Sequence, residues 1–261
     1  MHPLASWQAG QIIGVFTDID DTLTTEGAIT PDALQALADL KTAGLHVVPI
    51  TGRPVGWSEP FAARWPVDAI VAENGAVALV HTDGQPLAKR YQQDAATRQA
   101  HFERMQQVLT QIERNIPGAV RSQDSAGRET DIAIDHSEFT QLPQSAIDAV
   151  VRTMQASGMT ATVSSIHING WFGAHNKLSG ARWIVQQLWG RELDAEIHQW
   201  VYVGDSTNDQ IMFEHFAHSV GVANIRRFEA QLTHPPRCIT PSERGAGFAE
   251  MARHLLQAQR P

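Results

Sequence analysis

Short apolar runs and helical patterns alternate in the first third of the chain. Three of these runs are apolar and β-branched enough for strands buried on both faces: Ile12–Thr17, His46–Ile50 and Ala69–Ala72. A helical pattern separates the first two runs, with Thr30 as its N-cap, Pro31 in its first turn and an apolar face at Leu34, Leu37 and Leu40. This alternation predicts an α/β fold built on a parallel, doubly wound sheet.

The pattern changes after residue 82 and returns after residue 172. Thr82-Asp83-Gly84 is typical of a hairpin turn, and the residues that follow predict helix, two strands, helix and two strands, an α+β unit. Beyond this unit, a helix at 178–188 and strands at 200–203, 219–222 and 237–240 restore the α/β order. We therefore expect a discontinuous core of residues 1–82 and 173–261, with an inserted α+β cap domain of residues 83–172 that determines substrate specificity.

Composition excludes several classes of protein. Hydrophobic residues make up 43% and charged residues 18%, which is ordinary for a globular chain, and no apolar run approaches the ~20 residues of a membrane span. The N-terminal segment does not resemble a signal peptide, and the single Cys238 fits a reducing compartment. The net charge of −8 argues against a nucleic-acid partner. We expect a cytoplasmic protein that binds neither membrane nor nucleic acid, and nothing in the pattern indicates its oligomeric state.

Polar clusters follow the predicted strands, at the sheet edge where open α/β folds bind ligands. The clusters are Asp18 with Asp20, Thr51-Gly52-Arg53, Lys177, and Asp205-Ser206-Thr207-Asn208-Asp209. Carboxylates crowded into one crevice repel one another unless a cation lies among them, and a set of oxygen ligands favours Mg²⁺. Thr51, Lys177 and loop N–H groups suit the oxygens of a phosphate. The sequence therefore predicts a site for a metal and a phosphate.

The nucleophile that this site offers is a carboxylate. The sequence lacks the motifs of a serine-hydrolase elbow, a P-loop and a dinucleotide-binding loop. Asp18 can attack phosphorus and form an aspartyl-phosphate. Asp20 lies two residues further on, hence on the same side of an extended segment, where it can protonate the leaving alkoxide and later deprotonate the hydrolytic water. Mg²⁺ would offset the repulsion between this nucleophile and an anionic phosphate.

The four clusters, in this order, resemble the motifs of the haloacid-dehalogenase-like hydrolases. The cap between the second and third motifs, preceded by Glu73-Asn74-Gly75-Ala76, is similar to that of the class IIB subgroup. This subgroup includes sucrose-phosphate, mannosyl-phosphoglycerate and trehalose-phosphate phosphatases and the phosphomannomutases. Gly221-Val222-Ala223-Asn224 and Gly245-Ala246-Gly247-Phe248 are similar to the sugar-phosphatase branch, so the resemblance spans nearly the whole chain outside the cap interior.

The resemblance implies a role for each matched residue. Asp18 would be the nucleophile and Asp20 the acid/base. The metal would be held by Asp18, the backbone carbonyl of Asp20 and Asp205, with Asp209 supporting the metal shell. The remaining motif residues would contact phosphate: Thr51, Gly52, Arg53, Lys177 and Asn208.

Two further features concern specificity. Asp21 stands where the family usually has Gly, and because Asp tolerates unusual turn backbone we expect the loop to form. The cap segment at 164–171 mixes hydroxyl, imidazole, amide and indole groups, which suit sugar hydroxyls and ring faces. Its candidate specificity residues are His167, Asn169 and Trp171.

Two other functions use similar residues. A sugar phosphomutase needs the same aspartyl-phosphate, and differs in how its closed cap excludes water. A non-catalytic phosphate-binding module, such as a receiver domain, also combines acidic residues with a Thr and a Lys, but Asp20 and the inserted cap argue against it. We expect a Mg²⁺-dependent phosphomonoesterase that hydrolyses a small phosphorylated metabolite, in particular a sugar phosphate.

Overall fold

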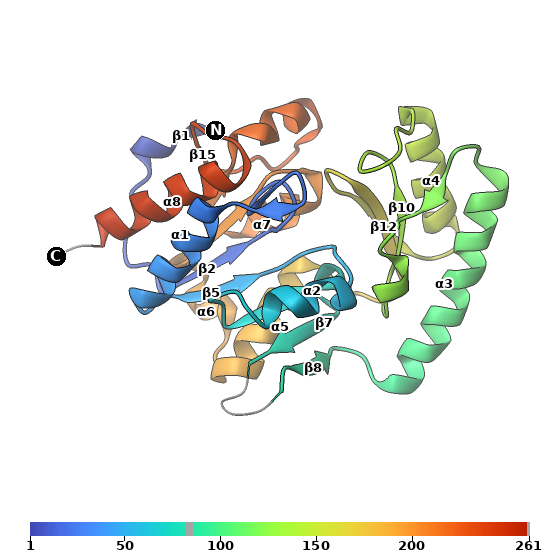
Figure 1. The fold of residues 1–261 in the computed structure, drawn as a ribbon, viewed down its shortest axis with the longest axis horizontal. Helices are drawn as coiled ribbons and strands as arrows, with labels where there is room; N and C mark the ends of the chain where they lie inside the picture. Colours follow the sequence, from blue (N-terminus) through green and yellow to red (C-terminus); the bar gives the residue numbers. More distant parts are fainter. Residues whose placement is uncertain (82–85, 260–261) are drawn as a thin grey trace.

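A six-stranded parallel sheet forms the centre of the computed structural model, which describes residues 1–81 and 86–259 (Figure 1). Its strands lie in the order β1 (His2–Pro3), β15 (Cys238–Ile239), β14 (His218–Gly221), β13 (Trp200–Gly204), β2 (Gly14–Thr17) and β5 (His46–Pro49). A parallel bridge between Ile50 and Val71 connects this sheet to β6 (Ala69–Ala72). The predicted α/β class and doubly wound parallel sheet are therefore confirmed.

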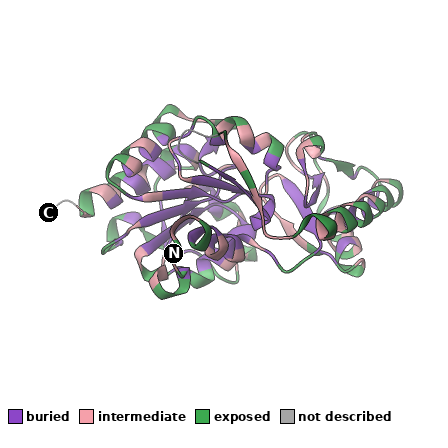
Figure 2. Cartoon of the chain, turned by 90° about the horizontal axis from the view of Figure 1, so that it is seen from below, coloured by how far each residue is buried: buried purple, intermediate pink, exposed green. Residues whose placement is uncertain are grey.

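Helices cover both faces of this sheet. On one face lie α1 (Pro31–Thr42), α2 (Val55–Ala62) and α8 (Arg244–Ala258), and on the other α5 (Lys177–Trp189), α6 (Leu193–Glu196) and α7 (Gln210–His215). Alternate strand residues serve the two layers: Val15 and Val201 pack with the first group, Phe16 and Tyr202 with the second. The strands are thus buried on both faces, as their uninterrupted apolar sequences predicted, and Figure 2 shows them as buried ribbons between the helices.

The apolar face of α1 differs from the predicted one at a single position. Leu37 and Leu40 are buried, but Leu34 is 37% exposed. The buried stripe is completed by Ala33 and Ala36 instead, and α1 packs along α8. Small alanines permit this close helix contact, which leaves Leu34 at the solvent edge.

A short antiparallel sheet continues from β6. β7 (Val77–Val80) pairs with β6 on one side and with β8 (Ala88–Tyr91) on the other. The turn predicted at Thr82-Asp83-Gly84 lies outside the described residues. A smaller hairpin of β3 (Thr24–Thr25) and β4 (Ala28–Ile29) follows the loop after β2. None of the helices in the described part of the chain is long and apolar enough to cross a membrane.

The inserted cap has its own antiparallel sheet and its own apolar core. Its strands lie in the order β11 (Thr160–Val163), β12 (His167–Trp171), β10 (Ile132–Asp135) and β9 (Val120–Arg121). The helices α3 (Ala95–Asn115) and α4 (Gln144–Ala156) cover its outer face, and the sheet lies toward the core (Figure 1). Short 3₁₀ helices complete the fold: Leu4–Ser6, Glu73–Gly75, Ser125–Gly127, Ile197–Gln199, Thr207–Asp209 and Ala223–Gln231.

Candidate active site

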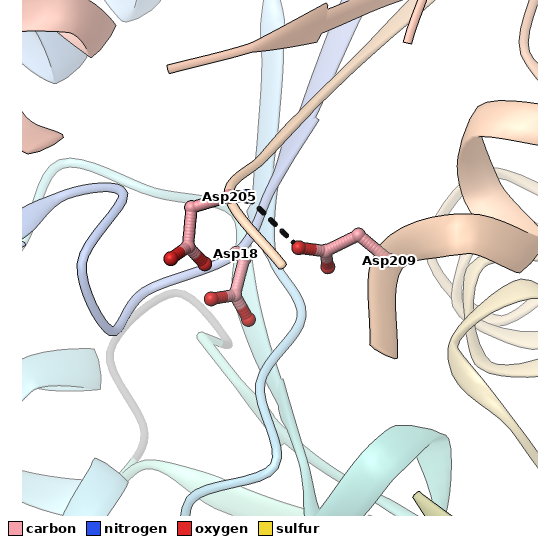
Figure 3. A group of neighbouring side chains, drawn as sticks. All are labelled: Asp18, Asp205 and Asp209. Atoms are coloured by element: carbon pink, nitrogen blue, oxygen red, sulfur yellow. Dashed lines mark hydrogen bonds between the residues drawn. The ribbon is translucent and has the colours of Figure 1, made fainter. Parts of the chain in front are cut away.

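Two neighbouring strands place two carboxylates side by side. β2 and β13 run parallel, and Asp18 and Asp205 are the residues that directly follow them. Asp209 reaches the same place from the 3₁₀ helix Thr207–Asp209. One carboxylate oxygen of each residue lies within 4.8 Å of the others, and all three side chains are buried (Figure 3). The structure therefore brings together three of the four predicted metal-site residues.

Lys177 supplies a positive charge to this group. It is the first residue of α5, whose N-terminus is closed by a capping box between Asn176 and Ser179. Its buried Nζ donates to Oδ1 of Asp18 and to Oδ1 of Asp209, each at 2.7 Å. Because the positive end of a helix repels a cation, these two carboxylates are what stabilise Lys177 at this position.

Asp209 holds the loop together. Its Oδ2 accepts hydrogen bonds from the backbone N–H groups of Asp205, at 2.9 Å, and Ser206, at 3.0 Å. Its Oδ1 accepts from Tyr202 Oη as well as from Lys177. A Cβ on Gly204 would lie 2.5 Å from the Asp209 carboxyl group, so this contact requires glycine at 204. Both Asp209 oxygens are thus engaged, which fits a supporting position in the metal shell.

Asp205 keeps one oxygen unpaired. Asn224 Nδ2 donates to its Oδ2 at 3.0 Å, whereas the buried Oδ1 receives no hydrogen bond from the described residues. Burial, together with repulsion from Asp18 and Asp209, raises the pKa of Asp205 well above its usual value. A buried, unpaired carboxylate oxygen beside other carboxylates is costly unless a cation binds to it. These residues therefore fit a hard divalent cation such as Mg²⁺.

Asp18 is the carboxylate that contacts Lys177 and faces Asp205. Burial raises its pKa to about 7, Asp209 and Asp20 add to the rise, and Lys177 opposes it. A carboxylate must be ionised to attack phosphorus. Lys177 favours this ionised form, and a cation bound at Asp205 would favour it as well.

Asp20 is held by Arg53 rather than by the metal-site carboxylates. Arg53 Nε lies 2.9 and 3.0 Å from the two carboxylate oxygens of Asp20. The same guanidinium donates to two cap residues, Asp124 through Nη1 at 3.1 Å and Glu138 through Nη2 at 2.7 Å. Burial raises the pKa of Asp20, although Arg53 opposes the rise. Arg53 is thus fully engaged by carboxylates, and its expected phosphate contact stays a prediction.

The other expected phosphate contacts lie in the loops beside Asp18. Thr51 follows β5, the strand next to β2, and is buried. The carbonyl of Gly52 accepts from two cap side chains, Arg128 at 3.0 Å and Asn169 at 3.2 Å. Asn208 accepts a hydrogen bond from Ser206 Oγ at 2.8 Å. The phosphate roles of these residues also remain predictions.

The three cap candidates occupy alternate positions of β12. His167 Nε2 lies 2.9 Å from Glu138, and Asn169 Nδ2 donates to Asp131 at 3.0 Å as well as to the Gly52 carbonyl. Trp171 belongs to the apolar core of the cap, where its Nε1 donates to the carbonyl of His175 at 2.9 Å. His167 and Asn169 therefore join the network between cap and core, whereas Trp171 packs within the cap.

Three residues that join core to cap were not predicted from the sequence. Asp124 and Glu138 come from cap segments without a motif, far along the chain from Arg53. Buried Glu73 accepts hydrogen bonds from the N–H groups of Val55 and Glu129, and so joins core to cap. For Glu73, the conspicuous Glu-Asn-Gly-Ala segment after β6 was the available signal.

The loop at Asp21 forms as expected, with Asp21 in left-handed backbone at φ 55°. Aspartate tolerates this conformation better than most residues, which explains how the loop forms with Asp21 at this position.

Comparison with known sequences gives one family. The model of the haloacid dehalogenase-like hydrolases matches residues 15–163, more than half of the chain. Among curated proteins, none matches the sequence.

Solved structures share the fold at low sequence identity. A protein of Thermoplasma acidophilum is similar with a TM-score of 0.72 and 15% identity, over 94% of this chain and 99% of the other. The sucrose-phosphatase of Synechocystis, solved with sucrose and phosphate, gives a TM-score of 0.66 and 18% identity, over 94% and 98%. A subclass IIB sugar phosphatase gives a TM-score of 0.64 and 15% identity, over 92% of this chain and 98% of the other.

Proposed function

The chain belongs to the haloacid dehalogenase-like hydrolase family, and from this membership we propose that it is a Mg²⁺-dependent phosphomonoesterase acting on a sugar phosphate. The observation that carries the proposal is the unpaired, buried oxygen of Asp205, which lies close to Asp18, while Lys177 donates a hydrogen bond to Asp18. This arrangement offers a cation position and a nucleophile within one crevice. The sugar-phosphatase relatives support the substrate class.

In the proposed reaction, a carboxylate oxygen of Asp18 attacks phosphorus. A bond forms between phosphorus and Asp18 while the bond to the leaving oxygen breaks, and Asp20 donates its proton to that oxygen. Water then attacks the aspartyl-phosphate, Asp20 takes up the proton of the water, and Asp18 is released with inorganic phosphate. Arg53 holds the Asp20 carboxyl group through both oxygens and so fixes its direction.

The metal would be held by Asp18, the backbone carbonyl of Asp20 and Asp205, with Asp209 in support. Bound there, Mg²⁺ would neutralise charge on the phosphoryl oxygens. Lys177, Thr51 and Asn208 would bind the remaining phosphate oxygens. We propose that residues 83–172 act as the cap and the rest as the catalytic core, and that the protein works in the cytoplasm, as its single, buried cysteine suggests.

The test is release of inorganic phosphate from a panel of sugar phosphates and small phosphorylated acids, with Mg²⁺ and with a chelator. We expect release that the chelator abolishes and that Asp18→Asn reduces by several orders of magnitude. Turnover by Asp18→Asn close to that of the wild type would refute the nucleophile. Transfer of phosphate between sugar positions without release would indicate a phosphomutase, and tight phosphate binding without either reaction a non-catalytic module.

A further inference from the structure

A cavity of about 430 Å³ lies between core and cap beside Asp20. On the core side it is lined by the loop after β2 and by Arg244, and on the cap side by Glu138 and Phe139. If Asp20 protonates the leaving oxygen, the rest of the leaving group must occupy the space next to Asp20. This inference thus rests on the proposed function and concerns which leaving group the cavity accepts.

Arg244 and Asp21 form an ion pair on the wall of this cavity. Nε of Arg244 lies 3.0 Å from Oδ1 of Asp21, and both side chains keep part of their surface exposed. Asn224 fixes both residues, since its Nδ2 donates to the Asp21 carbonyl at 3.0 Å and its Oδ1 accepts from the Arg244 N–H at 2.9 Å. The pair is therefore held by the backbone on both sides.

The Arg244 guanidinium has N–H donors that make no hydrogen bond with the described residues. Apart from Asp21, it makes no ion pair or hydrogen bond with residues 1–81 or 86–259. Arg53, the other arginine in the cavity wall, already contacts Asp20, Asp124 and Glu138. The Nη groups of Arg244 are thus the guanidinium donors in this wall that a leaving group can use.

The charge of the wall argues against an anionic leaving group. Apart from Asp20, which carries the proton for the leaving oxygen, the carboxylates of Asp21, Glu26 and Glu138 face two guanidinium groups, so the lining still has an excess of negative charge. Phe139 adds an apolar surface, since this residue is 62% exposed. Hydroxyl groups donate and accept at once and are complementary to an acceptor placed beside donors. Such a wall suits hydroxyls together with an apolar C–H face.

We propose that Asp21 and Arg244 form a hydroxyl-binding pair that selects phosphomonoesters of neutral, polyhydroxylated alcohols over those whose leaving group carries a carboxylate or a second phosphate. Asp21 is thus a specificity-determining residue, and Arg244 both compensates its charge and contacts the sugar. Phe139 packs against the ring from the cap.

The experiment compares kcat/KM for hexose phosphates, a phosphoglycerate and 4-nitrophenyl phosphate in the wild type and in Arg244→Met. We expect the wild type to prefer a hexose phosphate over the phosphoglycerate. Loss of a hydrogen bond from a charged donor lowers kcat/KM for the hexose phosphate by about tenfold or more relative to 4-nitrophenyl phosphate, mainly through KM. Arg253→Met, an exposed arginine of the same helix, is the matched control and keeps the wild-type ratio.

Two outcomes would refute the proposed role of Asp21 and Arg244 as a hydroxyl-binding pair. One is an equal fall for hexose and aryl substrates in Arg244→Met, which would indicate a structural role only. The other is wild-type preference for the phosphoglycerate. If Arg244→Met does not fold, the double variant Asp21→Gly/Arg244→Met removes both charges and is expected to show the same loss of selectivity.

A binding measurement separates this inference from the proposed function. Saturation-transfer NMR with unphosphorylated hexoses needs no turnover, and we expect contact with the wild type and a loss of contact in Arg244→Met. Phosphate release without any dependence of hexose binding on Arg244 refutes the pair and leaves the phosphatase intact. If hexose binding depends on Arg244 but no substrate releases phosphate, the proposed phosphatase activity is refuted and the proposed hydroxyl-binding pair stands.

Discussion

Replacing Lys177 by methionine tests whether the buried carboxylates depend on this cation. Its Nζ lies 2.7 Å from Asp18 and 2.7 Å from Asp209, and its side chain is 2% exposed. Lys177→Met keeps most of the side-chain volume but leaves the buried carboxylates of Asp18 and Asp209 without their positive partner. We therefore expect a large loss of stability together with a loss of phosphate binding.

The magnitude follows from the geometry. At an effective dielectric constant of about 20, unit charges at the 2.7 Å separation of each contact attract by about 6 kcal/mol. The cost of burying the ions offsets much of this, and removing one partner of a buried pair costs about 3–5 kcal/mol. In a chain of this size 1 kcal/mol corresponds to about 2–4 °C in Tm, so Lys177→Met lowers Tm by about 6–20 °C. The loss is smaller at pH 6 than at pH 8, because Asp18, whose pKa in the wild type is about 7, is already largely protonated at pH 6 and then carries little charge for Lys177 to compensate.

The assay is thermal unfolding with and without Mg²⁺, and Lys41→Met is the control. Lys41 makes an ion pair of the same 2.7 Å length with Asp68, but its side chain is 29% exposed, so its loss costs about 1 kcal/mol or less. We expect Mg²⁺ to raise the Tm of Lys177→Met more than that of the wild type, since fewer charges are compensated there. Equal Tm values for the two lysine variants would refute the reasoning.

Two further predictions concern the supports of the site. Burial lowers the pKa of His175 to about 4 from 6.5, so its contribution to stability is present above pH 6.5 and is lost as the pH falls toward 4. At 1.36 kcal/mol per pKa unit, this loss of stability is about 3 kcal/mol. We expect the stability of His175→Phe, measured by urea unfolding at pH 7 and at pH 4.5, to lack this loss. If His175→Phe kept the pH dependence of the wild type, His175 would not be its source. In Gly180→Ala the new Cβ would lie 2.6 Å from the Gly75 Cα, so we expect a loss of about 1–3 kcal/mol and, because α5 carries Lys177, a lower kcat. Gln186→Ala, exposed on the same helix, is the control, and equal kcat values would show that the packing of α5 does not position Lys177.

The parallel sheet was predictable because its principal strands are buried on both faces. Such strands appear in the sequence as uninterrupted apolar runs, and the polar cluster after each run marks the same sheet edge. β1 and the β3–β4 hairpin were not predicted, because strands of two residues contain no periodicity and these three lie outside the strand–helix alternation that located the equally short β15. Leu34 was misplaced because leucine spacing alone does not show that α8 packs against the alanines of α1.

The chemistry of the site was predictable as far as it lies in consecutive residues. Asp18 and Asp205 could be placed together because each directly follows a strand. The partners of Arg53 could not, because Asp124 and Glu138 belong to the cap and approach it only through the tertiary fold. Trp171 illustrates the same limit: every residue of β12 is buried, so alternation does not indicate which face a side chain serves.

The contacts between cap and core converge on the loops proposed to bind phosphate. Gly52 accepts hydrogen bonds from cap side chains, Thr207 donates to a cap carbonyl at 2.7 Å, and Glu73 binds cap N–H groups. Docking of the cap and ordering of the phosphate loops therefore use the same residues. Separation of the cap would admit water to these loops, and hydration lowers the pKa of a buried carboxylate. In the proposed reaction, Lys177 and a bound cation would thus be needed most when the cap is docked and Asp18 is buried, since this is the state in which Asp18 would have to be ionised.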